Sequence, residues 1–332
     1  YKDEVSNMEK MQYSIFRRDT QNASGKAKWD AADIFLELGF SELYRPSRYR
    51  MVRVIQQLVH TITLGNDVML SVQYPANKKF FYRILSKKNN RSFALIHDIE
   101  SLRMQADLAN DIEVLNSFDC IISHNPNMTG ALRSGGYAGN IVELGLFDYL
   151  GFEGEVSEER DRSVVSFAGN LAKAGFLTKI AETGLKLNLF GAPEPSSSGI
   201  SDNVQFIGSY PSNAVPGMIS GGWGLVWDGD STKTCSGLTG NYLRYNCPHK
   251  ASMYIVAERP LIVWKESGIA QYVQENRLGL VVSSLAEAAD TIGTIGDEDY
   301  EQFLCSVKKE KRDLCEGKHL KTAVANVIQR IV

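Results

Sequence analysis

The segment around Lys250 contains residue types that could bind a phosphate group. Pro248 is typical of the first turn of a helix, and Lys250 would then place its ammonium group near the N-terminus of that helix. Helix N-termini and ammonium groups both attract anions. Tyr245 and Asn246 precede the proline and add polar side chains to the same loop. We therefore interpret Lys250 as a phosphate ligand rather than as a solvated surface lysine.

A second turn with possible phosphate chemistry follows the apolar run 261–263. Gly268, Ile269 and Ala270 open a predicted helix. Its free N–H groups could hold a diphosphate, because Gly268 would let a ligand approach the backbone. A glycine placed there only for tight packing is at least as good an interpretation of this turn on its own.

His97 and Asp98 end the predicted strand 92–97, and both are candidates for acid–base chemistry. Asp98 could accept a proton from a substrate hydroxyl. The alternative is that Asp98 caps the next helix, which is a common use of aspartate after a strand. His124 closes another predicted strand, where a single histidine is more often structural.

The sequence does not predict a metal site. His97, His124 and His249 lack the spacing of metal ligands. The two Asp-x-Asp patterns, at 228–230 and 297–299, are interpreted as a polar turn and the start of a helix.

Apolar, β-rich runs alternate with helical patterns along most of the chain, which is typical of the α/β class with parallel sheets. The strands are predicted at 11–16, 67–73, 92–97, 120–123, 140–144, 163–168, 186–190, 204–208, 223–227, 261–263 and 279–282. The charged segment 153–162 is predicted to be an interdomain linker. We expect two doubly wound Rossmann-like domains, 11–152 and 163–315, and a C-terminal helix within 316–332 that crosses back to the first.

These elements predict where the chemistry takes place. Ligands of open α/β sheets bind beyond the carboxyl ends of the strands, so functional residues are expected in strand-end loops of both domains, facing across a cleft.

Composition excludes several classes of protein. The 332 residues include 36 Lys or Arg and 39 Asp or Glu, for a net charge of −3, which argues against a general nucleic-acid binder. The five cysteines form no C-x-x-C pair and are expected to be free thiols. No apolar run is long enough for a membrane span, and we expect a cytoplasmic protein.

Several blocks carry a resemblance to a known family. They are 167–173 (FAGNLAK), 222–227 (GWGLVW), 245–250 (YNCPHK) and 267–270 (SGIA), with 23–27, 96–103 and 123–128 in the first half. They resemble sugar-nucleotide transferases of the GT-B fold. More closely, they resemble the accessory glucosyltransferases that extend O-linked GlcNAc on serine-rich-repeat adhesins, and bacterial β-1,6-galactofuranosyltransferases. The resemblance covers nearly the whole chain.

The resemblance implies a metal-independent hexosyltransferase that binds its UDP-sugar mainly through the second domain. It places Lys250 and Lys173 near the diphosphate, Tyr210 near the nucleotide, and Ser24 and Gly25 at the donor site. Lys173 stands where the adhesin glucosyltransferases have arginine, which keeps the charge but loses the bidentate fork.

The resemblance also implies a glucose, galactose or galactofuranose donor and no cofactor apart from that UDP-sugar. The implied acceptor is a sugar on a GlcNAc-modified serine-rich-repeat glycoprotein or on a cell-surface glycan, and it enters from the first domain. A homo-oligomer, dimer or tetramer, without nucleic acid or a membrane span, is expected. The alternatives are a UDP-sugar epimerase of similar architecture and a noncatalytic scaffold for a partner transferase. A Rossmann dehydrogenase is disfavoured because no G-x-G-x-x-G follows a predicted strand.

Overall fold

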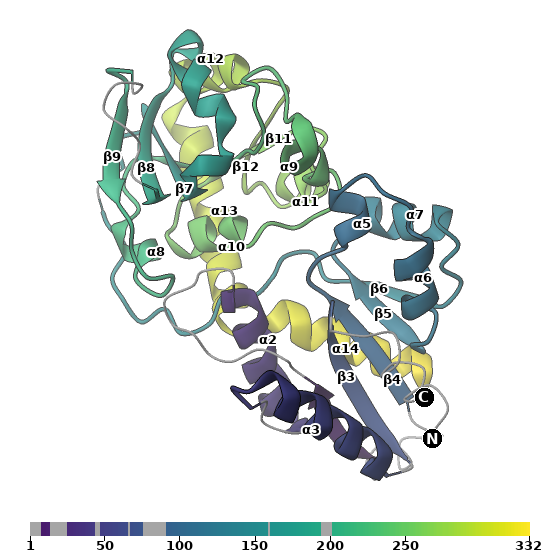
Figure 1. Cartoon of the computed structure of the whole chain (residues 1–332). Coiled ribbons are helices and arrows are strands. Elements are labelled where there is room, and N and C mark those ends of the chain that lie inside the picture. Colours follow the sequence, from purple (N-terminus) through teal and green to yellow (C-terminus); the bar gives the residue numbers. More distant parts are fainter. Residues whose placement is uncertain are drawn as a thin grey trace. The chain divides into compact units, whose positions relative to one another are not determined.

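The computed structural model divides the chain into two α/β units, each built on a parallel sheet with flanking helices (Figure 1). The structure describes residues 8–13, 25–43, 47–65, 67–75, 91–158, 160–193 and 201–332. Within these residues, unit 1 comprises the chain up to Leu144 together with His319–Val332, and unit 2 comprises Gly145–Lys318.

Unit 1 contains a six-stranded sheet in the order β2-β1-β3-β4-β5-β6. Its strands are β1 (Glu9–Tyr13), β2 (Ser41–Glu42), β3 (Val68–Tyr74), β4 (Arg91–Ile96), β5 (Cys120–Ser123) and β6 (Asn140–Glu143). Its helices are α2 (Lys26–Glu37), α3 (Arg50–Thr63), α5 (Glu100–Arg103), α6 (Ala109–Leu115), α7 (Pro126–Ser134) and α14 (Lys318–Ile331). The central strand β3 is buried along its whole length, as expected for a parallel strand covered on both faces.

Unit 2 contains a six-stranded sheet in the order β12-β11-β10-β7-β8-β9. Its strands are β7 (Val164–Asn170), β8 (Lys186–Ala192), β9 (Val204–Gly208), β10 (Trp223–Val226), β11 (Leu261–Trp264) and β12 (Gly279–Val282). Its helices are η2 (Leu171–Lys173), η3 (Gly175–Thr183), α8 (Val215–Met218), α9 (Gly237–Tyr242), α10 (His249–Val256), α11 (Ala270–Glu275), α12 (Leu285–Thr294) and α13 (Asp297–Cys315). Counted along the chain, this is the 3-2-1-4-5-6 order of doubly wound nucleotide-binding sheets.

The predicted C-terminal helical segment consists of two helices. Gly317, with φ of 70°, ends the first in the left-handed conformation that glycine adopts without a Cβ penalty. α13 packs in unit 2, whereas α14 belongs to unit 1 and buries Leu320, Val324 and Val327 there. His319 Nδ1 donates to the Leu144 carbonyl at 3.3 Å, which ties the start of α14 to the end of the first chain segment.

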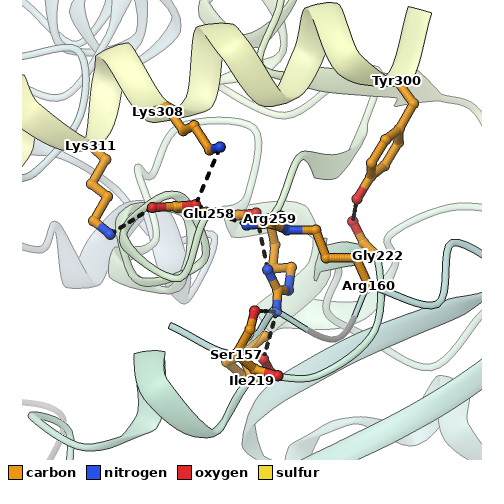
Figure 2. A network of polar contacts seen from close by, with 9 residues as sticks. All are labelled: Ser157, Arg160, Ile219, Gly222, Glu258, Arg259, Tyr300, Lys308 and Lys311. Carbon is orange, nitrogen blue, oxygen red and sulfur yellow. Dashed lines mark hydrogen bonds and ion pairs between the residues drawn. The ribbon is translucent and has the colours of Figure 1, made fainter. Parts of the chain in front are cut away.

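The charged segment 153–162, predicted to be a linker, is bound to unit 2. Figure 2 shows Arg160 and Arg259 in a polar network around Glu258. Arg160 pairs with Glu258 at 2.9 Å, and the fully buried Arg259 donates to the Ser157 carbonyl at 2.7 Å. These contacts hold the charged segment against the turn between α10 and β11. The boundary between the units lies earlier, between Leu144 and Gly145.

The predicted strands agree with the structure to within a few residues, except that the end of the strand predicted at 11–16 lies outside the described residues. The two-residue β2 was not predicted, because its exposed Ser-Glu pair has no apolar pattern. Among the described residues, no helix combines the length and the hydropathy of a transmembrane span. The five cysteines are free thiols, and burial raises the pKa of Cys235 and Cys247 to about 12.

Candidate functional site

The strand order of unit 2 creates a switch point between β7 and β10, where the chain winds in opposite directions on the two sides. Trp223 and Gly224 of β10 pair with Val165 and Ser166 of β7 in parallel register. In open α/β sheets, ligands bind beyond the carboxyl ends of the strands at such a point. In unit 2, these ends are followed by Lys173 and Asp228.

Helix α10 is fixed over this switch point by Tyr254. Its hydroxyl accepts a hydrogen bond from the Ala168 amide of β7 at 2.6 Å, and its side chain is fully buried. A Cβ at position 224 of β10 would lie 2.2 Å from Tyr254 Cγ, so glycine is required for this close approach. Lys250 lies four residues before Tyr254, on the same face of the helix, and therefore projects toward the same strands.

The Lys250 ammonium lies where the carboxyl ends of β7 and β10 meet. It donates to the Trp227 carbonyl at 3.1 Å and to Asp228 Oδ1 at 2.9 Å, and it lies 4.9 Å from the centre of the Phe167 ring. The side chain is 16% exposed. An ammonium group has three donors, so one remains without an acceptor among the described residues. Lys250 thus has a partly desolvated, pre-positioned ammonium group, and its role as a phosphate ligand stays a prediction.

Other predicted donor-site residues of unit 2 follow β7, precede α10 or follow β9. Lys173 is exposed at the end of η2, whose first turn is capped by Asn170. Tyr245 and Asn246 are half-buried in the loop before α10, and the buried Asn246 Oδ1 accepts no hydrogen bond within the part of the chain that the structure describes. Tyr210 follows β9, and its hydroxyl donates to the Ile207 carbonyl at 3.4 Å.

The turn at Gly268 differs from the prediction in one respect. The Gly268 N–H donates to the Leu243 carbonyl at 2.7 Å, and the Ala270 N–H donates to the Ser267 carbonyl at 3.0 Å. These two amides are therefore already used by the protein. The difference arises because the loop before α10 folds back onto this turn. Ile269, between Gly268 and Ala270 in the sequence, is buried.

An ion pair between Arg244 and Glu266 was not predicted. The Arg244 guanidinium contacts the Glu266 carboxylate and lies 4.6 Å from the centre of the Trp264 ring. Because Glu266 follows β11, this pair lies at the same edge of the sheet as Lys250. Of the two residues, only Glu266 could have been recognised from the sequence, because it is a carboxylate at the end of a predicted strand.

In unit 1, Asp98 lies just beyond β4 and does not cap the next helix. Helix α5 begins at Glu100, and its N-cap is Ile99 with no side-chain cap. Asp98 Oδ2 pairs with Arg103 at 2.7 Å, while Asp98 Oδ1 has no hydrogen-bond partner among the described residues. The capping interpretation is therefore wrong, and one carboxylate oxygen remains for another donor. The preceding residue, His97, continues the hydrogen bonding between β3 and β4. Its backbone N–H donates to the Tyr74 carbonyl at 2.8 Å.

The start of α2 carries a buried charge pair that was not predicted. Gly25 precedes this helix, whereas Ser24 lies outside the described residues. Lys26 Nζ contacts Asp30 Oδ1 at 2.6 Å, and both residues are buried. Burial lowers the pKa of Lys28, and the negative charge of Asp98 partly offsets this effect, so the first turn of α2 lies near the end of β4.

His124 is structural. Its Nε2 donates to the Ile96 carbonyl at 2.9 Å, and complete burial lowers the pKa of the imidazole to about 4. The next residue, Asn125, caps α7 by accepting from the Met128 N–H. His124 is therefore neutral at physiological pH and joins β5 to the end of β4.

This burial predicts a pH dependence of stability. The unfolded imidazole has a pKa near 6.5, so below that pH the unfolded state binds more protons, and the free energy of unfolding falls until the pH reaches about 4. The total loss is up to about 3 kcal/mol. His124→Gln keeps a donor for Ile96 and should flatten the curve in denaturant titrations between these pH values. A curve for His124→Gln that runs parallel to that of the wild type would refute the assignment.

One acidic residue of each Asp-x-Asp pattern is paired with a basic side chain. Asp228 pairs with Lys250, and Asp297 pairs with Arg162 in the first turn of α13. In the described part of the chain, no group of three His, Cys, Asp or Glu side chains could hold a metal ion.

Comparison with known proteins identifies relatives of both units. Residues 12–146 match the model of the glucosyltransferase 3-like N-terminal domain, and residues 165–327 match that of the C-terminal domain. The β-1,6-galactofuranosyltransferase WbbI of Escherichia coli K12 is 31% identical over 83% of this chain and 86% of its own. Glucosyltransferase 3 of Streptococcus gordonii is 23% identical over 96% of this chain and 98% of its own.

Solved structures show the same fold. A trehalose-6-phosphate synthase aligns with a TM-score of 0.58 and 12% identity, covering 93% of this chain and 84% of its own. The corresponding enzyme from Burkholderia xenovorans has a TM-score of 0.55 and 12% identity, covering 92% of this chain and 82% of its own. The two α/β units therefore form a GT-B fold.

Proposed function

The chain belongs to the glucosyltransferase 3-like family of glycosyltransferases, and from this premise we propose that it transfers glucose, galactose or galactofuranose from a UDP-sugar to a sugar acceptor. The acceptor is a sugar already attached to a protein or to a cell-surface glycan. The relatives named for galactofuranosyl and glucosyl transfer support both donor classes.

The position of Lys250 carries this proposal. Glycosyl transfer leaves negative charge on the departing nucleotide diphosphate, and an enzyme must neutralise that charge as it grows. Lys250 places a desolvated ammonium group at the switch point of the nucleotide-binding sheet, with one donor available. Lys173 adds a second, exposed cation beyond β7. The two lysines neutralise the leaving group without a metal ion, and the UDP-sugar is the only small molecule required.

UDP should therefore stabilise the protein against thermal unfolding without added divalent metal. At a hundredfold excess over Kd, one bound ligand adds about 2.7 kcal/mol to the free energy of unfolding. Differential scanning fluorimetry with UDP, with and without EDTA, measures this effect. A midpoint that does not move at millimolar UDP contradicts the site, and a shift that EDTA abolishes implicates an ion held near Asp228 instead of the lysines.

The acceptor part of the proposal rests on unit 1. Asp98 has one carboxylate oxygen held by Arg103 and the other unbonded within the described residues, so it could accept the proton of an acceptor hydroxyl. His97 is the neighbouring alternative. The further expectations of a cytoplasmic location and a homo-oligomer are part of the same proposal, and multi-angle light scattering tests the second.

An epimerase and a noncatalytic scaffold are separable from this function. An epimerase should convert a UDP-sugar without any acceptor, whereas a scaffold should not bind UDP. A mass-spectrometric screen of UDP-sugars against a GlcNAc-bearing peptide tests the donor and the acceptor together. Transfer of a hexose to that peptide supports the proposal, and acceptor-independent conversion of the nucleotide sugar favours the epimerase.

A further inference from the structure

Helix α3 of unit 1 exposes its apolar side chains. We call five of them the α3 apolar face: Met51, Val52, Ile55, Leu58 and Val59, which are 75, 43, 59, 43 and 49% exposed. Their spacing of three and four residues places them along one side of the helix. The half-buried side chains of α3 are mostly polar, namely Arg53, Val54, Gln56 and His60. This is the reverse of a helix that packs its apolar side on a protein core.

The segment 47–65, which contains this face, has only basic charged side chains. Residues 47–65 include Arg48, Arg50 and Arg53 and no acidic residue, in a chain whose acidic residues outnumber its basic ones. Arg48 and Tyr49 are exposed at the start of α3, with the guanidinium 4.6 Å from the centre of the Tyr49 ring. An apolar face bordered by arginine and tyrosine is typical of helices that lie in the interface of an anionic bilayer.

The size and charge of α3 argue against a second copy as its partner. The helix has 14 residues, so it is about 21 Å long and about 10 Å wide and offers on the order of 200 Å² of contact area. A stable dimer buries about 800 Å² on each partner. A symmetric contact in which two α3 helices run parallel would also bring their arginines together, which is repulsive.

We propose that the α3 apolar face docks on an anionic phospholipid surface, with the apolar side chains in the acyl boundary and Arg48 at the phosphate level. The helix is too short to span a bilayer, so it lies in the plane of the interface. This docking is independent of donor binding in unit 2.

Vesicle flotation of the full chain tests this docking. The wild-type protein should float with phosphatidylcholine vesicles that contain phosphatidylglycerol, bind pure phosphatidylcholine more weakly, and be released by salt. Ile55→Ser combined with Val59→Ser should lower the partition coefficient about ten- to hundredfold. Arg48→Gln should lower it about fivefold on the anionic vesicles.

Leu36→Ser combined with Met218→Ser is the matched control, because these apolar side chains are 45 and 41% exposed elsewhere. It should float like the wild type. Thermal unfolding midpoints verify that each variant is folded. A wild-type protein that does not float, or an α3 double variant that floats normally, overturns the proposal. A dimer that the same variant converts to a monomer, without flotation, would assign the face to a second copy. These readouts do not require glycosyl transfer.

Discussion

Lys250→Ala is expected to lower kcat/KM for the sugar nucleotide about ten- to hundredfold. The substitution removes a charge-assisted contact from a partly desolvated position, and such contacts contribute about 1.5–3 kcal/mol. In the proposed function, Lys250 contacts the diphosphate both before and during bond cleavage, so UDP affinity should fall as well. Initial rates at varied donor concentration and UDP titration calorimetry measure the two effects.

Lys265→Ala is the matched control for this substitution. Lys265 also follows a strand of the second sheet, β11, but its side chain is exposed. Loss of an exposed charge should change kcat/KM by less than about fivefold. Asp228→Asn tests the alternative that Lys250 only stabilises Asp228, since it removes the charge of that partner but leaves the lysine in place. Equal kinetic losses in the Lys250 and Lys265 variants would refute the donor assignment.

Asp98→Asn should lower transfer about 10²- to 10⁴-fold while UDP affinity stays near that of the wild type. Asparagine keeps the size of the side chain and can still accept from Arg103, but it cannot take a proton from the acceptor hydroxyl. The capping role that would have made this substitution silent is excluded by the N-cap at Ile99. Single-turnover transfer assays together with UDP titration separate catalysis from binding.

Glu100→Gln is the control for Asp98→Asn, because Glu100 is an exposed carboxylate two residues away. It should retain transfer within a few fold. If Asp98→Asn also retains transfer within a few fold with intact UDP binding, Asp98 is not the base. His97, or a mechanism without a protein base, would then have to be considered.

Much of the fold was predictable because the strands are short and apolar. β5, β9 and β12 have the predicted bounds. Parallel strands covered on both faces are recognisable as nearly continuous apolar runs. The strand order was less accessible, because it depends on which distant segments pair. The tie between β7 and α10, from the Ala168 amide to the Tyr254 hydroxyl, joins residues 86 positions apart.

The candidate site was predictable where function depends on residue type and local position. Lys250 carries its own signal, an ammonium group two residues after a helix-starting proline. No local signal identifies Asp228 and Phe167 as its partners, because Phe167 lies within β7 and Asp228 follows β10. The turn at Gly268 shows the opposite case. Its glycine suggested free amides, but the amide of Gly268 is used by Leu243, a contact that local sequence does not encode.

Local sequence alone was therefore sufficient to establish the α/β class, the strand positions and the candidate cation at Lys250, because hydrophobic period and helix-start chemistry act over a few residues. Tertiary structure decided which side chains meet. It paired Lys250 with Asp228 and Asp98 with Arg103, and it turned the apolar side of α3 outward. The physical reason is that each of these outcomes depends on how whole elements pack, and packing is set by long-range contacts that no short segment contains.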